Sequence, residues 1–411
     1  MELQLWEGDL GVYLKAALTA KPLCVSCVGR LFARIGTGIT NRERGRQALS
    51  RLQLDAADEC WLCEGLAEEI SKFADLVMAE LANWDFDTFL VGCRLDPDLL
   101  DREETLWAEL GLRTYEPIKA EINREVGKIV ERRLGRRAEF SRPDVTAIIS
   151  TMLDHVEVQV APLYIYGRYR KLVRGIPQTR WPCRRCRGVG CEKCDFKGKL
   201  YDTSVEEIIA EHVIREARAE SHSFHGMGRE DIDARMLGSG RPFVLELHRP
   251  GRRKLDLEAL AERINGSGQV EVEDLRPSNR EEVVAIKGRM CDKSYGVLIQ
   301  LGEEVALQKV KEAVEALKAG KIVQRTPTRV AHRRADKERI RRVLGTEIGT
   351  LRGSTLELRL RTEAGTYVKE LIHGDEGRTR PSLAELLGTE AQVVELDVLE
   401  VHDEELDGKG L

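Results

Sequence analysis

The run SFHGMGREDIDARMLGSGRPFVLEL, residues 223–247, decides how the second half of this sequence is organised. Two glycine-bearing turns enclose a cluster of charged residues, and an apolar strand follows directly. Asp231 and Asp233 lie in the cluster between Arg229 and Arg235. A carboxylate beside guanidinium groups is stabilised in its ionised form, as a nucleophile or an electrostatic stabiliser requires. On the pattern alone, a salt-bridged surface turn is the more ordinary interpretation.

Strand-like and helix-like runs alternate on both sides of this cluster. Residues 201–411 contain the strand-like RPFVLELHRP and YGVLIQL and the helical ALQKVKEAVEALKAG. Residues 71–180 contain an amphipathic helix that continues from EGLAEEISKFADLVMAEL and the strand candidate FDTFLVGCRL. The period-two pattern of DHVEVQVAPLYIYGRY predicts paired strands. The fold class we expect is therefore α+β in both halves.

Eight of the ten cysteines form four C-x-x-C pairs, a spacing that lets two thiolates face one tetrahedral metal ion. The first two pairs predict one structural zinc site, and the second two pairs, which are closely spaced, predict a second. The expected ligands are Cys24, Cys27, Cys60 and Cys63 for the first site and Cys183, Cys186, Cys191 and Cys194 for the second. The alternatives are buried free thiols for the first set and redox use for the second.

Charge is unevenly distributed along this chain of 411 residues, whose net charge is −5. Residues 164–199 hold eleven Lys/Arg against two acids, a net charge of +9, interleaved with tyrosines and Trp181. Residues 321–342 hold nine Lys/Arg against two acids, a net charge of +7. Both stretches predict surfaces that contact RNA, with Arg333 and Arg334 among the contacts.

The sequence also excludes several classes of protein, because it lacks the segments and motifs that those classes require. No stretch approaches the ~20 apolar residues of a membrane span, and the start MELQLWEGDL is not a secretory signal. No phosphate-binding loop of the form G-x-x-x-x-G-K-[ST] and no strand followed by G-x-G-x-x-G is present, so we expect no nucleotide cofactor. The arginines beside Asp231 also disfavour a Mg²⁺-dependent nuclease. We expect a cytoplasmic protein.

Four motifs in order carry a resemblance to a known family. GREDIDARMLGSGRPFVLEL, CDKSYGVL (291–298), RTPTRVAHRR (325–334) and GTYVKELIHGDEGRTRPSL (365–383) together resemble the archaeal and eukaryotic tRNA pseudouridine synthases that modify uridines 54 and 55 of the TΨC arm. Upstream, CVSCVGRLFARIGTGITNRERG and LDPDLLDREE resemble the accessory half of that family, which carries a zinc knuckle and a THUMP module for RNA binding. The resemblance covers most of the chain.

This resemblance implies a role for individual residues. It makes Asp231 the catalytic nucleophile and places Lys369 near it, with Leu371 as the apolar partner of the basic residue. It makes Tyr295 the residue that packs on the target uracil and Tyr367 a second substrate contact. The family needs no organic cofactor and no metal for its chemistry, so zinc would be structural.

The resemblance also implies the division of the chain. We expect a zinc-knuckle module over 1–70, a THUMP-containing α/β domain over 71–180, the second cysteine cluster over 181–200 and a catalytic domain over 201–411 with a mixed, largely antiparallel sheet flanked by helices. We expect a monomer that acts on tRNA. A non-catalytic RNA-binding protein remains the main alternative, and a THUMP-bearing methyltransferase or thiolase would need a donor site that the sequence lacks. Whether nucleotide 54, nucleotide 55 or both are modified stays open.

Overall fold

The computed structural model describes residues 9–332 and 334–403. The described residues divide into two compact units, one made of residues up to 162 together with 249–254 and the other of residues 163–248 together with those from 255 onward. The division after residue 162 falls inside the segment 71–180, for which we expect one domain from the sequence. It does so because the strand that starts at Leu163 joins the sheet of the second unit.

The first unit begins with three helices around the first pair of cysteine knuckles. Its helices are α1 (Asp9–Ala20), α2 (Val25–Leu31), α3 (Asn41–Leu52), the short η1 (Leu66–Glu68), α4 (Ile70–Leu81), α5 (Pro97–Leu110) and α6 (Ile118–Leu134). Helices α2 and α3 cross with their backbones in contact, since a Cβ on Gly29 would lie 1.7 Å from Asn41 O and one on Gly45 would lie 1.9 Å from Val25 O. Only glycine fits at this crossing.

A four-stranded sheet completes the first unit. Its strands are β1 (Thr88–Arg94), β2 (Arg137–Ala138), β3 (Val145–Ser150) and β4 (His155–Val160), in the order β2-β1-β3-β4. β1 is parallel to β2 and β3, and β3 is antiparallel to β4. Helices α4 and α6 pack on this sheet, and their apolar faces share one core with it.

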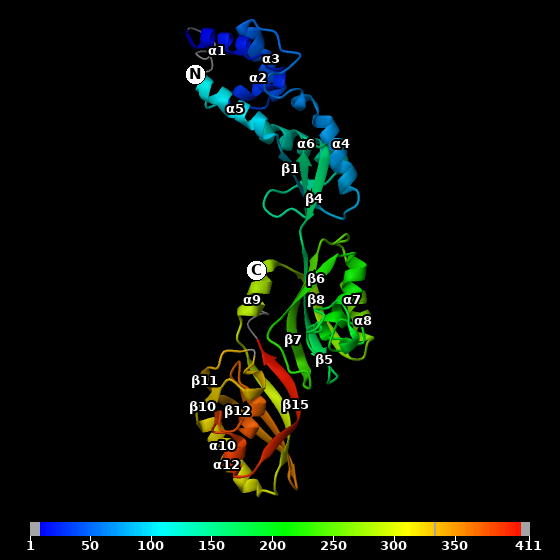
Figure 1. Cartoon of the computed structure of the whole chain (residues 1–411), viewed down its shortest axis with the longest axis vertical. Coiled ribbons are helices and arrows are strands. Elements are labelled where there is room, and N and C mark those ends of the chain that lie inside the picture. Colours follow the sequence, from blue (N-terminus) through cyan, green and yellow to red (C-terminus); the bar gives the residue numbers. More distant parts are fainter. Residues whose placement is uncertain (1–8, 333, 404–411) are drawn as a thin grey trace. The chain divides into compact units, whose positions relative to one another are not determined.

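The second unit is built on a long twisted sheet, seen in the lower half of Figure 1. Its strands are β5 (Leu163–Lys171), β6 (Ser221–Gly226), β7 (Arg235–His248), β8 (Val270–Ser278), β9 (Asp292–Leu301), β12 (Val343–Arg352), β13 (Thr355–Thr362) and β15 (Ala391–His402). They lie in the order β12-β13-β9-β15-β7-β5-β8, and β6 pairs with β7. All neighbours are antiparallel except β7 and β15. The expected α+β class with a mixed, largely antiparallel sheet is confirmed.

Helices and a small second sheet flank this long sheet. They are η2 (Glu192–Cys194), α7 (Val205–Ala217), α8 (Leu257–Asn265), α9 (Arg280–Gly288), α10 (Leu307–Ala319), η3 (Thr328–Val330), α11 (Val368–His373), α12 (Leu383–Leu387), β10 (Ile322–Arg325), β11 (Glu338–Arg341) and β14 (Thr379–Arg380). Helices α7 and α8 pack over one core, and α10, α11 and α12 pack over another. The cores meet at Tyr295 of β9, which contacts both.

Two sequence-based expectations about residues 155–171 are wrong. The strands β4 and β5 are not paired with each other, because β4 pairs with β3 while β5 pairs with β7 and β8. Tyr166 and Tyr169 do not face RNA, because β5 lies in the interior of the long sheet and both side chains are buried in its core. Two of the three basic residues of this strand are likewise enclosed, since Lys171 is fully buried and Arg168 nearly so.

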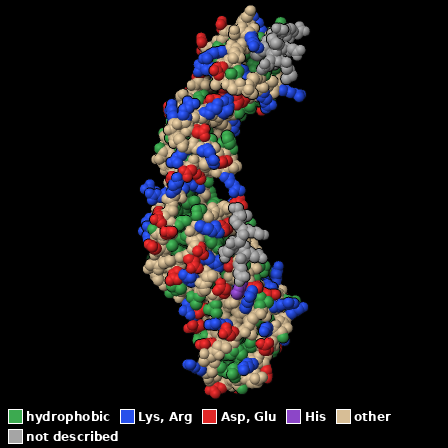
Figure 2. All heavy atoms as spheres, turned by 180° about the vertical axis from the view of Figure 1, so that it is seen from behind, with side chains coloured by type: hydrophobic (Ala, Val, Ile, Leu, Met, Phe, Trp, Pro, Cys, Tyr) green, Lys and Arg blue, Asp and Glu red, His purple; other side chains and the backbone are tan. Residues whose placement is uncertain are grey.

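Charged side chains of both signs are mixed on the surface. On the face that Figure 2 shows, Lys/Arg and Asp/Glu side chains are interspersed over most of the area. Among the described residues, none of the helices combines the length and the apolar character that a membrane crossing requires.

Candidate active site

The loop between β6 and β7 holds Asp231 at the surface and its neighbour Glu230 in the interior. Glu230 accepts a hydrogen bond from Arg241 Nε at 2.9 Å and another from Tyr169 Oη at 2.8 Å, and all three side chains are buried. The buried Lys171 donates from Nζ to the backbone carbonyl of Asp231 at 3.1 Å. Charge-assisted hydrogen bonds in a buried setting fix the backbone on which Asp231 stands.

Two cations lie beside the half-buried carboxylate of Asp231. Arg329 Nη1 is 3.2 Å from Asp231 Oδ2, and Lys369 Nζ is 3.7 Å from the same oxygen. Asp233 has a different environment: its side chain is 67% exposed, against 34% for Asp231, and Lys369 Nζ lies 2.6 Å from it. Burial raises the pKa of Asp233, but the hydrogen bond from Lys369 outweighs it, so the pKa lies below its usual value.

The ion pair of Asp233 differs from the one that the sequence suggests. The position of Asp233 between Arg229 and Arg235 in the chain suggests an ion pair with one of these neighbours. Lys369 takes that role, and Arg235 instead pairs with Asp397, with 2.6 Å between Arg235 Nη2 and Asp397 Oδ2. The cause is strand register, since Arg235 of β7 stands directly opposite Asp397 of the parallel strand β15.

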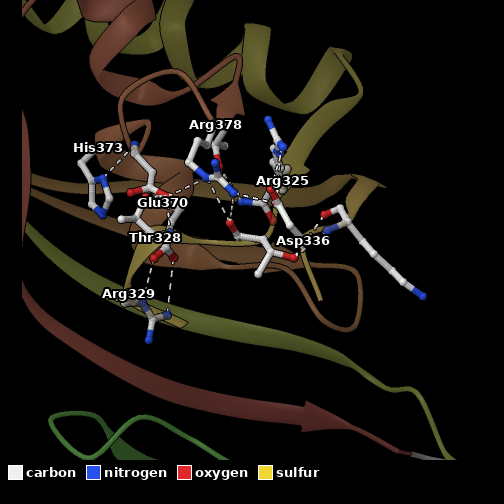
Figure 3. Close-up of polar contacts among 12 residues, drawn as sticks. Arg325, Thr328, Arg329, Asp336, Glu370, His373 and Arg378 are labelled. Atoms are coloured by element: carbon white, nitrogen blue, oxygen red, sulfur yellow. Dashed lines mark hydrogen bonds and ion pairs between the residues drawn. The ribbon is translucent and has the colours of Figure 1, made fainter. Parts of the chain in front are cut away.

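Arg329 connects Asp231 to a buried carboxylate. It lies in η3, and its Nε donates to Glu370 Oε1 of α11 at 2.7 Å (Figure 3). The Glu370 side chain is only 2% exposed. Burial lowers the pKa of Arg329, but the hydrogen bond and charge of Glu370, together with Asp231, outweigh it and raise the pKa above its usual value. Arg329 and Glu370 were both missed from the sequence.

The loop that carries Arg329, residues 326–337, is fastened at its base. Asp336 accepts hydrogen bonds from Arg378 Nη2 at 2.7 Å and is paired with Arg325 Nη2 at 2.6 Å (Figure 3). Arg378 Nη2 also donates to the backbone carbonyl of Thr326 at 2.7 Å. The strands β10 and β11 flank this loop, and the contacts of Arg378 tie it to the turn after α11.

That turn is the segment 374–381, which holds two glycines, two acids and two arginines. Asp375 Oδ2 accepts from the backbone N–H of Thr328 at 2.9 Å, so the turn also holds the residue next to Arg329. His373 Nδ1 accepts from the backbone N–H of Asp375 at 3.0 Å. The segment therefore positions the loop 326–337 from two sides.

A cavity of about 650 Å³ opens beside Asp231. Tyr295, at the centre of β9, lines it, and burial raises the pKa of this phenol to about 12. Tyr367 lines it as well, and Arg334 Nη1 donates to Tyr367 Oη at 3.0 Å. The backbone of Tyr367 is held on both sides by the buried side chain of Gln324, at 2.9 Å each.

Lys293 is a further ionisable residue of this cavity. It lies two residues before Tyr295 on the same strand, so both side chains point to one face of the sheet. Its Nζ donates to the backbone carbonyl of Cys291 at 2.9 Å. Burial and the nearby charge of Arg241 lower the pKa of Lys293 to about 8.

The structure brings most of the predicted site residues together. Asp231, Lys369, Tyr295, Tyr367 and Arg334 line the one cavity. Leu371 does not line it. Leu371 is fully buried in the core beneath α11, and Arg333 lies outside the described residues.

Both cysteine sets have the geometry of closed metal sites. Within each set the four sulfur atoms lie within 4.8 Å of one another. The Sγ atoms of Cys24 and Cys63 are 3.7 Å apart, and those of Cys183 and Cys191 are 3.9 Å apart. Such spacings fit the edges of a tetrahedron with Zn–S bonds of ~2.3 Å and are too long for a disulfide. The donor chemistry therefore fits structural Zn²⁺ at both places.

Comparisons with known proteins identify the family of this chain. A family model described as "Pus10, C-terminal" matches residues 164–402, which is more than half of the chain. The chain belongs to the Pus10 family. A second model, "Pus10 THUMP domain, archaeal", matches residues 73–150, from α4 to the end of β3. The family resemblance predicted from the sequence is confirmed, and as a family member the chain is an isomerase enzyme.

Curated relatives match along nearly the whole length. The protein "tRNA pseudouridine synthase Pus10" of Methanothrix thermoacetophila is 47% identical over 92% of this chain and 92% of its own. The protein of the same name from Methanopyrus kandleri is 43% identical over 95% and 98% of the two chains. Among solved structures, the "Crystal Structure of a Cbf5-Nop10-Gar1 Complex" matches with a TM-score of 0.32 and 20% identity, covering 49% of this chain and 47% of that chain.

Proposed function

We propose that this enzyme converts uridine to pseudouridine at nucleotides 54 and 55 of the TΨC arm of tRNA, with Asp231 as the catalytic nucleophile. The observation that carries the proposal is the position of the Asp231 carboxylate, between Arg329 and Lys369 at the edge of a cavity that also contains Tyr295. The relatives named tRNA pseudouridine synthase support tRNA as the substrate.

The reaction requires a carboxylate next to the sugar and a base outside its stack. The bond from N1 of uracil to C1′ breaks, the base turns, and C5 bonds to C1′ while the C5 proton is released and N1 gains a proton. Asp231 acts on the ribose side and stabilises or forms the transient covalent state. Arg329 and Lys369, at 3.2 and 3.7 Å, stabilise its negative charge throughout. The uracil must leave its stack to reach the cavity.

The remaining residues of the cavity orient the substrate in this proposal. Tyr295 packs on the flipped uracil, since a large aromatic ring stacks on any base. Tyr367 contacts the same nucleotide, with its hydroxyl held by Arg334 at 3.0 Å. Arg333 and Arg334 contact phosphates of the arm. Leu371 acts from the core, where it holds α11 and hence Lys369 and Glu370 in position.

The first unit supplies binding and no chemistry in this account. Its region matched by the THUMP model would contact tRNA.

The two cysteine sets would each hold one structural Zn²⁺, with Cys24, Cys27, Cys60 and Cys63 at one site and Cys183, Cys186, Cys191 and Cys194 at the other. A bound metal there replaces apolar core that such short segments cannot build. We propose further that the enzyme works as a cytoplasmic monomer and without a cofactor for catalysis.

Tritium release from tRNA labelled with 5-³H-uridine tests this function directly. Under single-turnover conditions, we expect one tritium per modified site, and tRNA transcripts with cytidine at 54, at 55 or at both should release one, one and none. Binding of tRNA without any tritium release would support the alternative of a non-catalytic RNA-binding protein. Release that persists when both positions are changed would overturn the assignment of the sites.

A further inference from the structure

Residues 181–200 form a small knuckle within the catalytic unit. Its stem is closed by the antiparallel bridge between Pro182 and Lys199 and by the hydrogen bond from Cys183 N to the carbonyl of Gly198 at 2.8 Å. The sulfur atoms of the second cysteine set lie inside it. The cysteines account for the fold of the segment, but they do not account for the role of the side chains on its outer surface.

The two turns of the knuckle present apolar side chains to solvent. Val189 is 90% exposed and Phe196 is 73% exposed. Val189 stands between Gly188 and Gly190, whose φ angles are 104° and 106°, and Phe196 itself has a φ of 59°. The left-handed region is disfavoured for a bulky residue such as Phe196, and an aromatic ring this exposed contributes little to the core. These side chains therefore have the character of contact residues.

The rest of the knuckle surface is basic. Residues 180–199 hold seven Lys/Arg and two acids, a net charge of +5. Six of the seven are exposed, and four of these six form no ion pair within the described part of the chain; the four are Arg184, Arg185, Arg187 and Lys193. Free cations around exposed apolar tips are complementary to a polyanion with accessible base faces.

The knuckle is attached at the rim of the active site. Trp181, at its stem, lines a pocket of about 190 Å³ together with Asp231 and Lys369. The guanidinium of Arg229, two residues before Asp231, lies 6.0 Å from the ring centre of Trp181. Lys199 Nζ is paired with Glu207 of α7 at 2.7 Å, which holds the stem on the unit. A nucleic acid in the active site would pass close to this stem.

We propose that the knuckle is an RNA-binding arm of the catalytic unit. Phe196 and Val189 pack against unpaired bases of the substrate, and the exposed arginines contact the flanking phosphates. The proposal rests on the proposed function for the identity of the RNA, which is the tRNA that carries the target uridine. Stacking on aromatic residues and salt-dependent phosphate contacts are the usual means by which short modules hold single-stranded RNA.

Two variants of the full-length enzyme test this arm. We expect Val189→Ser/Phe196→Ser to weaken tRNA binding about five- to fiftyfold, the effect of losing one to two base contacts. Arg185→Gln/Arg187→Gln should reduce the slope of log affinity against log salt by about one to two units. The matched controls are Val394→Ser, an exposed apolar residue on β15, and Lys311→Gln/Arg352→Gln, both exposed and outside the knuckle. These controls should bind tRNA as the wild type does.

A measurement on the wild type guards against misfolding of the variants. Cross-linking to tRNA that contains 4-thiouridine, followed by mass spectrometry, should attach nucleotides to the peptide with Val189 or Phe196. Variants that bind tRNA with wild-type affinity and salt slope, or cross-links confined to peptides outside 181–200, would overturn the proposal. Variants that bind tRNA as the wild type does but differ from it in binding an acidic protein would also overturn the proposal. Tritium release by the wild type is scored separately, so an inactive enzyme counts against the function and not against the arm.

Discussion

Glu370 determines where the guanidinium of Arg329 lies, and so how Asp231 is flanked. Its carboxylate is buried and 2.7 Å from Arg329 Nε. Glu370→Gln keeps the shape but removes the charge, so Arg329 loses its buried anchor. We expect the single-turnover rate of pseudouridine formation to fall about 10- to 100-fold, which corresponds to ~1.5–3 kcal/mol for a charge-assisted hydrogen bond. Binding of tRNA should remain within about twofold of wild type.

The matched control for this variant is Glu338→Gln, the same change at an exposed residue of β11. Its rate should equal that of the wild type. Equal rates for Glu370→Gln and the wild type would show that Arg329 does not depend on its buried partner.

Lys293 gives a prediction about pH. Its pKa is lowered from 10.5 to about 8 in the folded enzyme, so between these values the unfolded chain binds more protons than the folded one. The free energy of unfolding should therefore rise with pH between about 8 and 10.5. Below pH 8 the buried ammonium is charged, and its full destabilising effect is present. In Lys293→Met this rise should be absent. Urea denaturation at pH 7.5, 9 and 10 measures the difference, with Lys287→Met, an exposed lysine of the same cavity, as control.

The sequence predicts part of this site and misses the rest for physical reasons. Asp231 could be singled out from Asp233 only by the family motif, since composition and periodicity make both aspartates candidates, and the structure places Asp231 at the cavity. Arg329 and Glu370 are separated by 41 residues, and only the packing of η3 against α11 brings them together. Their residue types are ordinary for a charged surface, so no local pattern distinguishes a buried ion pair from a solvated one.

At the scale of elements, the loop 326–337 depends on contacts at its base. Asp336 is paired there with Arg325 and Arg378, and the hydrogen bond from Arg325 is the main cause of the lowered pKa of Asp336. Asp336→Asn should loosen the base and reduce the single-turnover rate about three- to tenfold, because Arg329 is then less well placed. The melting temperature should stay within about 2 °C of wild type, since the pair is exposed.

Glu347→Gln, which neutralises an exposed carboxylate of β12, is the matched control for the loop and should leave the rate unchanged. A loss of rate in the control equal to that in Asp336→Asn would trace the effect to net charge rather than to the loop.

The sequence predicts whether a segment is a helix or a strand more readily than it predicts which strands pair. Alternation over DHVEVQVAPLYIYGRY correctly indicates two strands, because period-two patterning is a local property. It cannot reveal that Ala161 and Pro162 carry the chain from one sheet to another, so that β4 and β5 have different neighbours. The same limit explains Tyr166 and Tyr169, whose burial follows from the position of β5 inside the long sheet.

At the scale of the whole molecule, two metal sites should hold the short segments in place. We expect the purified enzyme to contain about two Zn²⁺ per chain and Cys60→Ser to contain about one, with a less stable first unit. Cys93→Ser, at a buried cysteine outside both sets, should retain two. Metal analysis of the three proteins checks the prediction, which fails if Cys60→Ser keeps the wild-type zinc content.

The central claim is that Asp231, and not Asp233, is the catalytic nucleophile. The two aspartates lie in one loop and both are close to Lys369. Asp231 faces the cavity between Arg329 and Lys369, whereas Asp233 is more exposed and is engaged by Lys369 at 2.6 Å. The decisive measurement is single-turnover pseudouridine formation on tRNA by Asp231→Asn and Asp233→Asn, with tRNA affinity recorded for both. The account predicts that Asp231→Asn binds tRNA normally and forms no pseudouridine, while Asp233→Asn retains measurable turnover. Near wild-type formation by Asp231→Asn, or loss of activity in Asp233→Asn alone, would contradict it.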